Sequence, residues 1–248
     1  CRFGRVADPN MPWALSVSEC AEIVLSRVEV QGSYGFSQGS PSFGGSALRI
    51  STSDVMLVDC VLEGAKGYDA PAGGGAGGQA LRVTGASRVA VAAPQFSGGP
   101  QGRGSGIFGC QDGPSGAGLD VNGSTVVLRG DPSLHWVTAG KVDGICTNYK
   151  GPDISVVNGT VVVSGVSFDP GNVLVSNGTL TETVDLEPYL TIGGTDEPGG
   201  HRDITLTGAA GAPCILVVSA VPVHVPVGGF DDKLWVGLSG PHLLVPLV

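Results

Sequence analysis

The sequence predicts an all-β protein whose chain winds into a parallel β-solenoid. Three observations carry this prediction. A coil-start pattern, Ala-Leu-x-Val or a close variant, recurs along the chain, and two further short apolar runs follow it in a fixed order. In addition, 42 glycines and 17 prolines among 248 residues disfavour helices. We therefore expect almost no helix.

The coil-start pattern occurs five times. Its copies begin at residues 14, 47, 80, 118 and 153, so the spacings are 33, 33, 38 and 35 residues. Each copy continues through a tight turn into a second apolar run, such as 55–57 or 126–128. In most copies a third run follows, ending at Val30, Leu62, Phe96 or Phe168. Three short β segments per copy correspond to one coil of a parallel β-helix, and we predict about five to seven coils.

Stacking explains how such short strands become stable. A strand of about four residues is too short to be stable in an isolated hairpin, but stacked coils pair at about 4.8 Å. Alternation within each coil-start strand then buries one column of Leu, Ile and Val side chains. The residues between them point outward, namely Ser16, Arg49, Arg82, Asp120 and Ser155. A β-sandwich is the alternative, but it does not explain the shared order of apolar runs.

Glycine-rich excursions separate successive copies, at 31–46, 64–78 and 97–118. Glycine accepts backbone angles closed to other residues, so we expect these excursions to lie flat and stack. From about residue 180 the period is lost. We predict a parallel β-helix over 1–195, and a C-terminal β-rich cap or the start of a second β module over 196–248.

The pattern ALxV…xVxLxxxxFxGG, followed by a glycine-rich excursion, resembles right-handed, pectate-lyase-like parallel β-helix repeats. The resemblance covers residues 14 to about 180. It implies right-handed winding and a bacterial secreted or cell-surface protein. Low lysine content, abundant Gly, Ser and Thr, and six cysteines also fit an exported chain, so we expect an extracellular or cell-surface location.

Two cysteines occupy matching places in consecutive copies. Cys110 and Cys146 precede their coil starts by eight and seven residues, so we predict a Cys110–Cys146 disulfide. Cys60 aligns with Val28 and Val166, which predicts a buried thiol. The pairing of Cys1, Cys20 and Cys214 stays open. The cysteines form no C-x-x-C pair, so we expect no zinc.

The charge balance excludes some partners. A formal charge of −9, with 13 Lys and Arg against 22 Asp and Glu, disfavours nucleic acid. No run of 18 apolar residues predicts a membrane span. Both ends of the sequence suggest a segment of a longer protein.

One outward column carries the chemistry that the shape does not require. Arg49, Arg82 and Asp120 could grip an acidic sugar; the structural alternative is that Arg82 pairs with Asp120 while Arg49 is solvated. Glycosidases need two positioned carboxylates, and this column offers one, so we predict no catalytic residue.

We expect no cofactor and no metal. A calcium site in the acidic turn around His201, formed with Asp196, Glu197 and Asp203, is the alternative to a solvated turn.

We therefore expect a non-enzymatic scaffold: a structural or adhesive segment of an exported or cell-surface bacterial β-helix protein that binds glycans or other cell-surface components. Two alternatives remain. One is a polysaccharide-active lyase or hydrolase working on the outer β-helix face. The other is a filament subunit that self-associates end to end.

Overall fold

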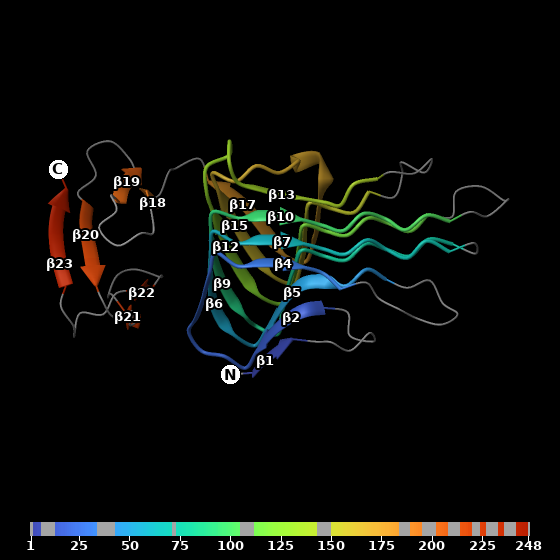
Figure 1. The fold of residues 1–248 in the computed structure, drawn as a ribbon, viewed down its shortest axis with the longest axis horizontal. Coiled ribbons are helices and arrows are strands. Elements are labelled where there is room, and N and C mark those ends of the chain that lie inside the picture. Colours follow the sequence, from blue (N-terminus) through green and yellow to red (C-terminus); the bar gives the residue numbers. More distant parts are fainter. Residues whose placement is uncertain are drawn as a thin grey trace. The chain divides into compact units, whose positions relative to one another are not determined.

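A computed structural model describes residues 2–5, 13–33, 43–70, 73–104, 112–142 and 150–183, together with six strands beyond residue 188. The chain forms two compact units, Cys1–Val184 and Asp185–Val248. The first is a parallel β-solenoid with three sheets, here called A, B and C (Figure 1). The prediction of an all-β solenoid is confirmed.

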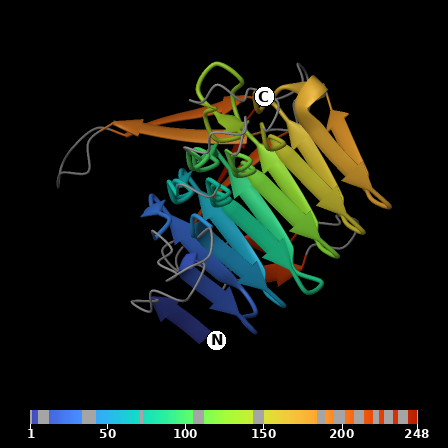
Figure 2. The same ribbon diagram turned by 90° about the vertical axis from the view of Figure 1, so that its right-hand side faces the viewer.

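Each sheet collects one strand position from successive coils (Figure 2). Sheet A contains the coil-start strands β2 (Trp13–Ser18), β5 (Ser46–Ser51), β8 (Leu81–Thr84), β11 (Leu119–Asn122), β14 (Ile154–Val157) and β16 (Val173–Ser176). Sheet B contains β3 (Ile23–Ser26), β6 (Asp54–Val58), β9 (Arg88–Ala92), β12 (Thr125–Arg129), β15 (Thr160–Ser164) and β17 (Thr179–Thr183). Sheet C contains β4 (Glu29–Gln31), β7 (Val61–Glu63), β10 (Gln95–Ser97) and β13 (Trp136–Thr138). These strands pair in parallel, and β1 (Arg2–Arg5) adds an antiparallel edge to β2.

The number of complete coils is four, fewer than the expected five to seven. Four coils contribute strands to all three sheets, and two shorter coils then contribute only to sheets A and B. After β15 the chain touches sheet C through a single bridge between Ser167 and Trp136. It then enters a short 3₁₀ helix, η2 (Pro170–Asn172), capped by Asp169. Because Pro170 lacks an N–H, it cannot donate to a sheet ladder, which fits the loss of the third strand here.

The solenoid interior is the apolar core that the alternation predicted. Register pairs Leu48 with Leu81, Leu81 with Leu119, and Leu119 with Ile154. These four side chains are at most 1 % exposed. A single core therefore runs through successive coils.

The last described coil of the solenoid carries a charged residue where earlier coils carry a core residue. Glu182 occupies the register position of Val163, an interior position, and it is exposed. A buried carboxylate without a partner is costly, so a further rung stacked on Glu182 would be unfavourable. The described part of the solenoid thus closes its own stack at this side.

The turn between sheets A and B repeats two devices. The first is a backbone position with positive φ, held by Glu19, Thr52, Gly85, Gly123, Asn158 and Asn177 at 49° to 71°. The second is a buried hydroxyl ladder. The backbone N–H groups of Cys20, Ser53 and Ser87 donate to the hydroxyls of Ser53, Ser87 and Ser124, at 3.0, 3.2 and 3.2 Å. Each turn is thereby tied to the next coil.

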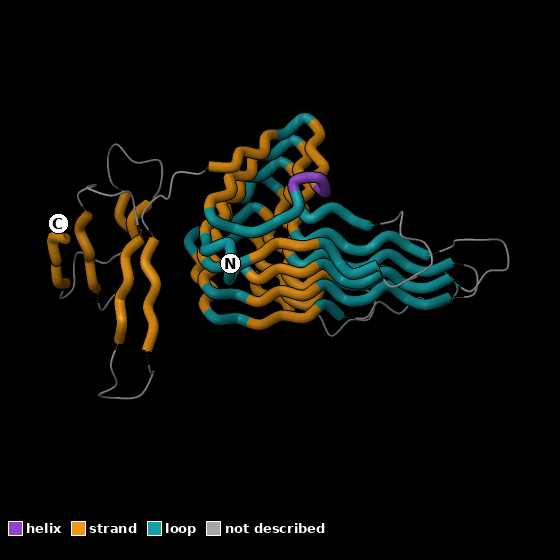
Figure 3. The backbone as a smooth tube through the Cα atoms, turned by 90° about the horizontal axis from the view of Figure 1, so that it is seen from above, coloured by secondary structure: helices purple, strands orange, loops and turns teal. Residues whose placement is uncertain are grey.

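The glycine-rich excursions form a second hydrogen-bonded layer system, here called the glycine slab and defined by residues 64–70, 73–79, 98–104 and 112–118. Its chains run out from sheet C and return to sheet A (Figure 3). Outgoing chains of successive coils are joined by bonds from the N–H groups of Gly64, Gly67 and Ala70 to the carbonyls of Ser97, Pro100 and Arg103. The donors and the acceptors both advance by three residues. Three is the period of a polyproline II chain, whereas a β-strand has a period of two.

Outgoing and returning layers are bonded with the same period. Gly99 and Gly102 donate to Gly78 and Gly75, while Gly116 donates in turn to Gly99. At these contacts the backbones touch, and a Cβ added at Gly99 would overlap the carbonyl of Ala65. Only glycine fits where the layers cross this closely, as at the axis of collagen. The expectation that the excursions stack is confirmed.

The second unit consists of antiparallel pairs. They are β18 (Tyr189–Gly194) with β19 (Arg202–Thr207), β20 (Cys214–Ser219) with β23 (His242–Leu247), and β21 (His224–Pro226) with β22 (Lys233–Trp235).

Candidate functional site

The outer face of sheet A carries the three residues singled out from the sequence. Register places Ser16, Arg49, Arg82, Asp120 and Ser155 side by side in successive coils. The Nε of Arg82 lies 3.5 Å from a carboxylate oxygen of Asp120. The two side chains are 45 % and 21 % exposed, so solvent screens the pair and its contribution is about 0–1 kcal/mol. This is the ion pair of the structural alternative.

Arg49 has a different environment. Its guanidinium carbon lies 4.4 Å from the ring centroid of Trp13. A cation–π contact of this kind contributes about 0.5–2 kcal/mol. Its Nε atom is buried without a hydrogen-bond partner among the described residues. Arg49 is therefore not simply solvated, as the structural alternative supposed; it stacks on an aromatic ring and keeps one donor unused.

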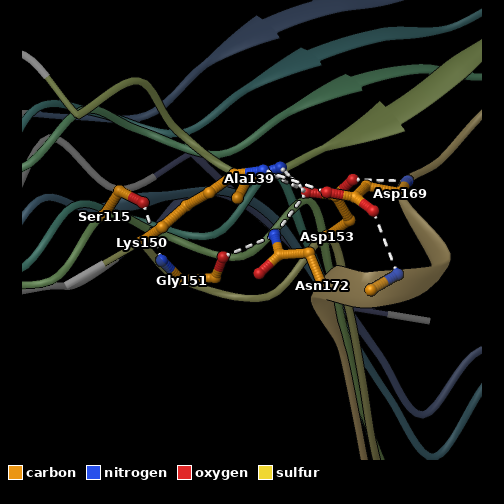
Figure 4. A network of polar contacts seen from close by, with 8 residues as sticks. Ser115, Ala139, Lys150, Gly151, Asp153, Asp169 and Asn172 are labelled. Carbon is orange, nitrogen blue, oxygen red and sulfur yellow. Dashed lines mark hydrogen bonds and ion pairs between the residues drawn. The ribbon is translucent and has the colours of Figure 1, made fainter. Parts of the chain in front are cut away.

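A polar network lies around Asp153, immediately before β14 (Ile154–Val157) of sheet A (Figure 4). The buried carboxylate of Asp153 accepts hydrogen bonds from the Ala139 N–H at 2.8 Å, the Asn172 side-chain amide at 2.7 Å and the Asp169 N–H at 2.9 Å. Lys150 lies 3.8 Å from Asp153 and 3.7 Å from Asp169. The carboxylate of Asp153 already accepts hydrogen bonds from three groups of the fold, so we assign Asp153 a structural role. It joins the end of the fourth coil to η2.

The outer face of sheet C holds an exposed tryptophan. Trp136 is 39 % exposed and lies in register beside Gln95, which in turn lies beside Val61. Thr138 is on the same strand and, two residues along, on the same face. Trp136 was not predicted as a site residue, because the third apolar run of the fourth coil is not evident in the sequence.

His135 sits at the corner before β13. The residue is 9 % exposed, and its Nδ1 accepts a hydrogen bond from the Asp131 N–H at 2.7 Å. Nδ1 is therefore unprotonated, and the ring is neutral. Burial lowers the pKa of His135, while the carboxylates of Asp131 and Asp59 oppose the shift. Asp131 has its own pKa lowered, because it accepts hydrogen bonds from Ser133.

In the first unit the described cysteines are Cys20 and Cys60, and both thiols are free and buried, while the backbone of Cys214 lies on β20. Cys60 lies in register with Val28, because the N–H of the residue that follows it, Val61, donates to the Val28 carbonyl. Burial raises the pKa of the Cys60 thiol. This residue is a packed thiol with low reactivity.

Several sequence predictions fall outside the described residues. They are the Cys110–Cys146 disulfide, Cys1, and the acidic turn with Asp196, Glu197 and His201. Asp203 lies on β19. Within the described ranges no cluster of three or more His, Cys, Asp or Glu could hold a metal ion, and no helix there has the length and hydropathy to span a membrane.

No known protein family model, no curated protein and no solved structure matches the chain.

Proposed function

We propose that the chain is a rigid structural and adhesive scaffold from an exported or cell-surface bacterial protein, and that it binds glycans without turning them over. We also propose that the solenoid is right-handed and pectate-lyase-like, on the strength of the repeat pattern. In this proposal the extracellular location follows from composition, and the rigidity follows from the fold.

The observation that carries the proposal is the double hydrogen-bond lattice. One lattice links the strands of sheets A, B and C, and the other links the chains of the glycine slab at three-residue intervals. Both lattices run through the same coils, so a coil cannot move in one without straining the other. The slab thereby extends a stiff surface away from the solenoid, which suits a protein that holds or displays a binding surface.

The outer face of sheet A supports binding more than catalysis. Its single column carboxylate, Asp120, is engaged by Arg82. Hydrolysis of a glycosidic bond uses two carboxyl groups at a defined separation. Arg82, whose side chain is 45 % exposed, and Arg49 remain the candidate contacts for an acidic sugar; the unpaired Nε of Arg49 is itself buried and does not face a ligand.

The filament alternative is less well supported. Glu182 at an interior position would be buried by a second copy stacked on that end of the solenoid. Light scattering of the full chain tests the point, and we expect a monomeric particle.

The main test pairs binding with turnover. The full chain is applied to a glycan microarray and is also incubated with polygalacturonate, alginate and hyaluronan, while new reducing ends and unsaturated products are measured. We expect binding to at least one glycan class and no product. Failure to bind any glycan would remove the adhesive role. Turnover that is lost in Asp120→Asn would instead establish the enzyme alternative.

A further inference from the structure

The outer face of sheet C is a flat surface with one exposed aromatic side chain, which lies on β13, the last strand of this sheet. Figure 1 shows β13, β10, β7 and β4 side by side, running directly into the outgoing chains of the glycine slab. Trp136 lies on β13 and is 39 % exposed. Apart from Val61, two coils away, the described residues in register with Trp136 and Thr138 on this face are polar, so the indole is not part of a continuous apolar surface.

Neutral hydrogen-bonding groups surround Trp136 on this face. Gln95 lies one coil before it and Ser167 one coil after it, each about 5 Å away along the stack. Thr138 follows on the same strand, with Ser97 in register beside it. Within the described part of the chain, the side chains of these four polar residues make no hydrogen bond, and neither does the indole N–H. They are free to bind a ligand.

The chemistry of this face selects a class of ligand. A flat apolar ring bordered by uncharged donors and acceptors fits a molecule with a face of C–H groups and a rim of hydroxyls. Among the described residues that pair in register with Trp136 or Thr138 on this face, none is Lys or Arg, so an anionic ligand would gain no charge pairing. Glu63 lies in register beside Ser97, one coil further away, which also disfavours anions.

A protein partner fits less well. A stable protein interface covers roughly 800 Å² on each side and has an apolar centre. Here the exposed large apolar side chains on sheet C and its adjoining corner are Trp136, Val61 and Leu134. Val61 lies two coils from Trp136, so these side chains do not form one continuous apolar centre.

We propose that Trp136 is the stacking platform of a binding site for a neutral pyranose within a glycan chain, with Gln95 and Thr138 supplying hydrogen bonds to its hydroxyls. The inference rests on the proposed adhesive function and assigns it a surface separate from the Arg49 and Arg82 column. The site binds and does not catalyse.

The test measures affinity of the full chain by isothermal titration calorimetry. The probes are cellohexaose, mannohexaose and galactohexaose, with hexagalacturonate as the acidic counterpart. We expect at least one neutral probe to bind. Trp136→Ala should weaken that binding at least about tenfold, since a central Trp typically dominates an interface. Trp136→Phe, which keeps an aromatic face, should stay within about threefold of the parent.

Two further variants separate the site from a folding defect. Gln95→Ala removes a neighbouring polar group without touching the core, and it should weaken the same probe severalfold. Arg88→Ala, at an exposed position of β9 on sheet B, should leave neutral-probe binding unchanged. Melting temperatures close to that of the parent show that each variant is folded.

The outcomes distinguish the two proposals. If a neutral probe binds equally well to the parent, Trp136→Ala and Gln95→Ala, the Trp136 site is wrong while adhesion survives. If only hexagalacturonate binds, and binding depends on Arg82, the site is again wrong. If no glycan binds here or on the microarray, the adhesive function fails and this inference fails with it.

Discussion

Replacing Gly99 by Ala tests whether the glycine slab is a close-packed part of the fold. Gly99 lies where three chains meet: its N–H donates to Gly78 at 2.7 Å, and its carbonyl accepts from Gly116 at 2.8 Å. A Cβ at this position would overlap the backbone of Ala65. The neighbour is backbone and cannot rotate away, so the layers must separate.

The magnitude follows from three terms. Overpacking costs about 1–3 kcal/mol. Weakening the two flanking backbone hydrogen bonds adds about 0.5–1.5 kcal/mol for each bond. The smaller unfolded-state entropy of Ala returns about 0.4–1 kcal/mol. The three terms sum to a net loss of about 1–5.6 kcal/mol. The midpoint of this range, about 3 kcal/mol, lowers the melting temperature by roughly 6–12 °C for a chain of this size.

The assay is thermal unfolding followed by circular dichroism, with Gly123→Asn as the matched control. Gly123 has a φ of 62° and open space around its Cβ position, and Asn158 and Asn177 occupy the equivalent turn at 51°. The control should therefore melt close to the parent. A Gly99→Ala protein that melts within about 2 °C of the parent would show that the layers are not in contact, and the reasoning would be refuted.

Three further predictions concern single buried groups. Burial lowers the folded-state pKa of His135, so the unfolded state binds the proton more readily, and stability should fall as the pH drops below about 6.5. The urea midpoints at pH 7.5 and pH 5.5 should therefore differ less in His135→Gln than in the parent. An unchanged difference would contradict the assignment. Asp153→Ala leaves the N–H groups of Ala139 and Asp169 without an acceptor, and it should lower the free energy of unfolding, measured by urea titration, by at least about 2 kcal/mol. Asp153→Asn should have a smaller effect. An unchanged free energy of unfolding in Asp153→Ala would show that the network is dispensable. Ser87→Ala leaves the Ser53 N–H without its acceptor and should lower the free energy of unfolding by about 1–3 kcal/mol. Ser87→Cys should lower it less, because Cys20 occupies the equivalent turn position in the first coil. Equal losses of stability in the two variants would argue against the hydroxyl ladder.

Much of the solenoid was predictable because its core is periodic in sequence. Leu48, Leu81 and Leu119 were assigned to one interior column from the repeat alone, and register and burial agree. A column of this kind leaves a signal in every copy. The stacking of the excursions followed from glycine content alone.

Other features leave no such signal. The three-residue hydrogen-bond period of the slab depends on which chains become neighbours, and the sequence does not say so. Trp136 was missed because its strand follows an enlarged turn at 130–135, which shifts the third apolar run relative to other copies. The stack of Arg49 on Trp13 joins two adjacent coils, β2 and β5, so no local sequence pattern predicts it.

The different periods of the two lattices have a consequence for how the protein could change in length. A strand must change by two residues to keep its faces, but an excursion keeps its contacts when it changes by three. Adding one triplet to the outgoing chain and one to the returning chain would lengthen an excursion by about 9 Å, at 3.1 Å per residue. The solenoid core would be untouched, since it meets the slab only at the ends of sheets C and A. Reach and stability are therefore separately adjustable in this architecture, provided that adjacent excursions lengthen together.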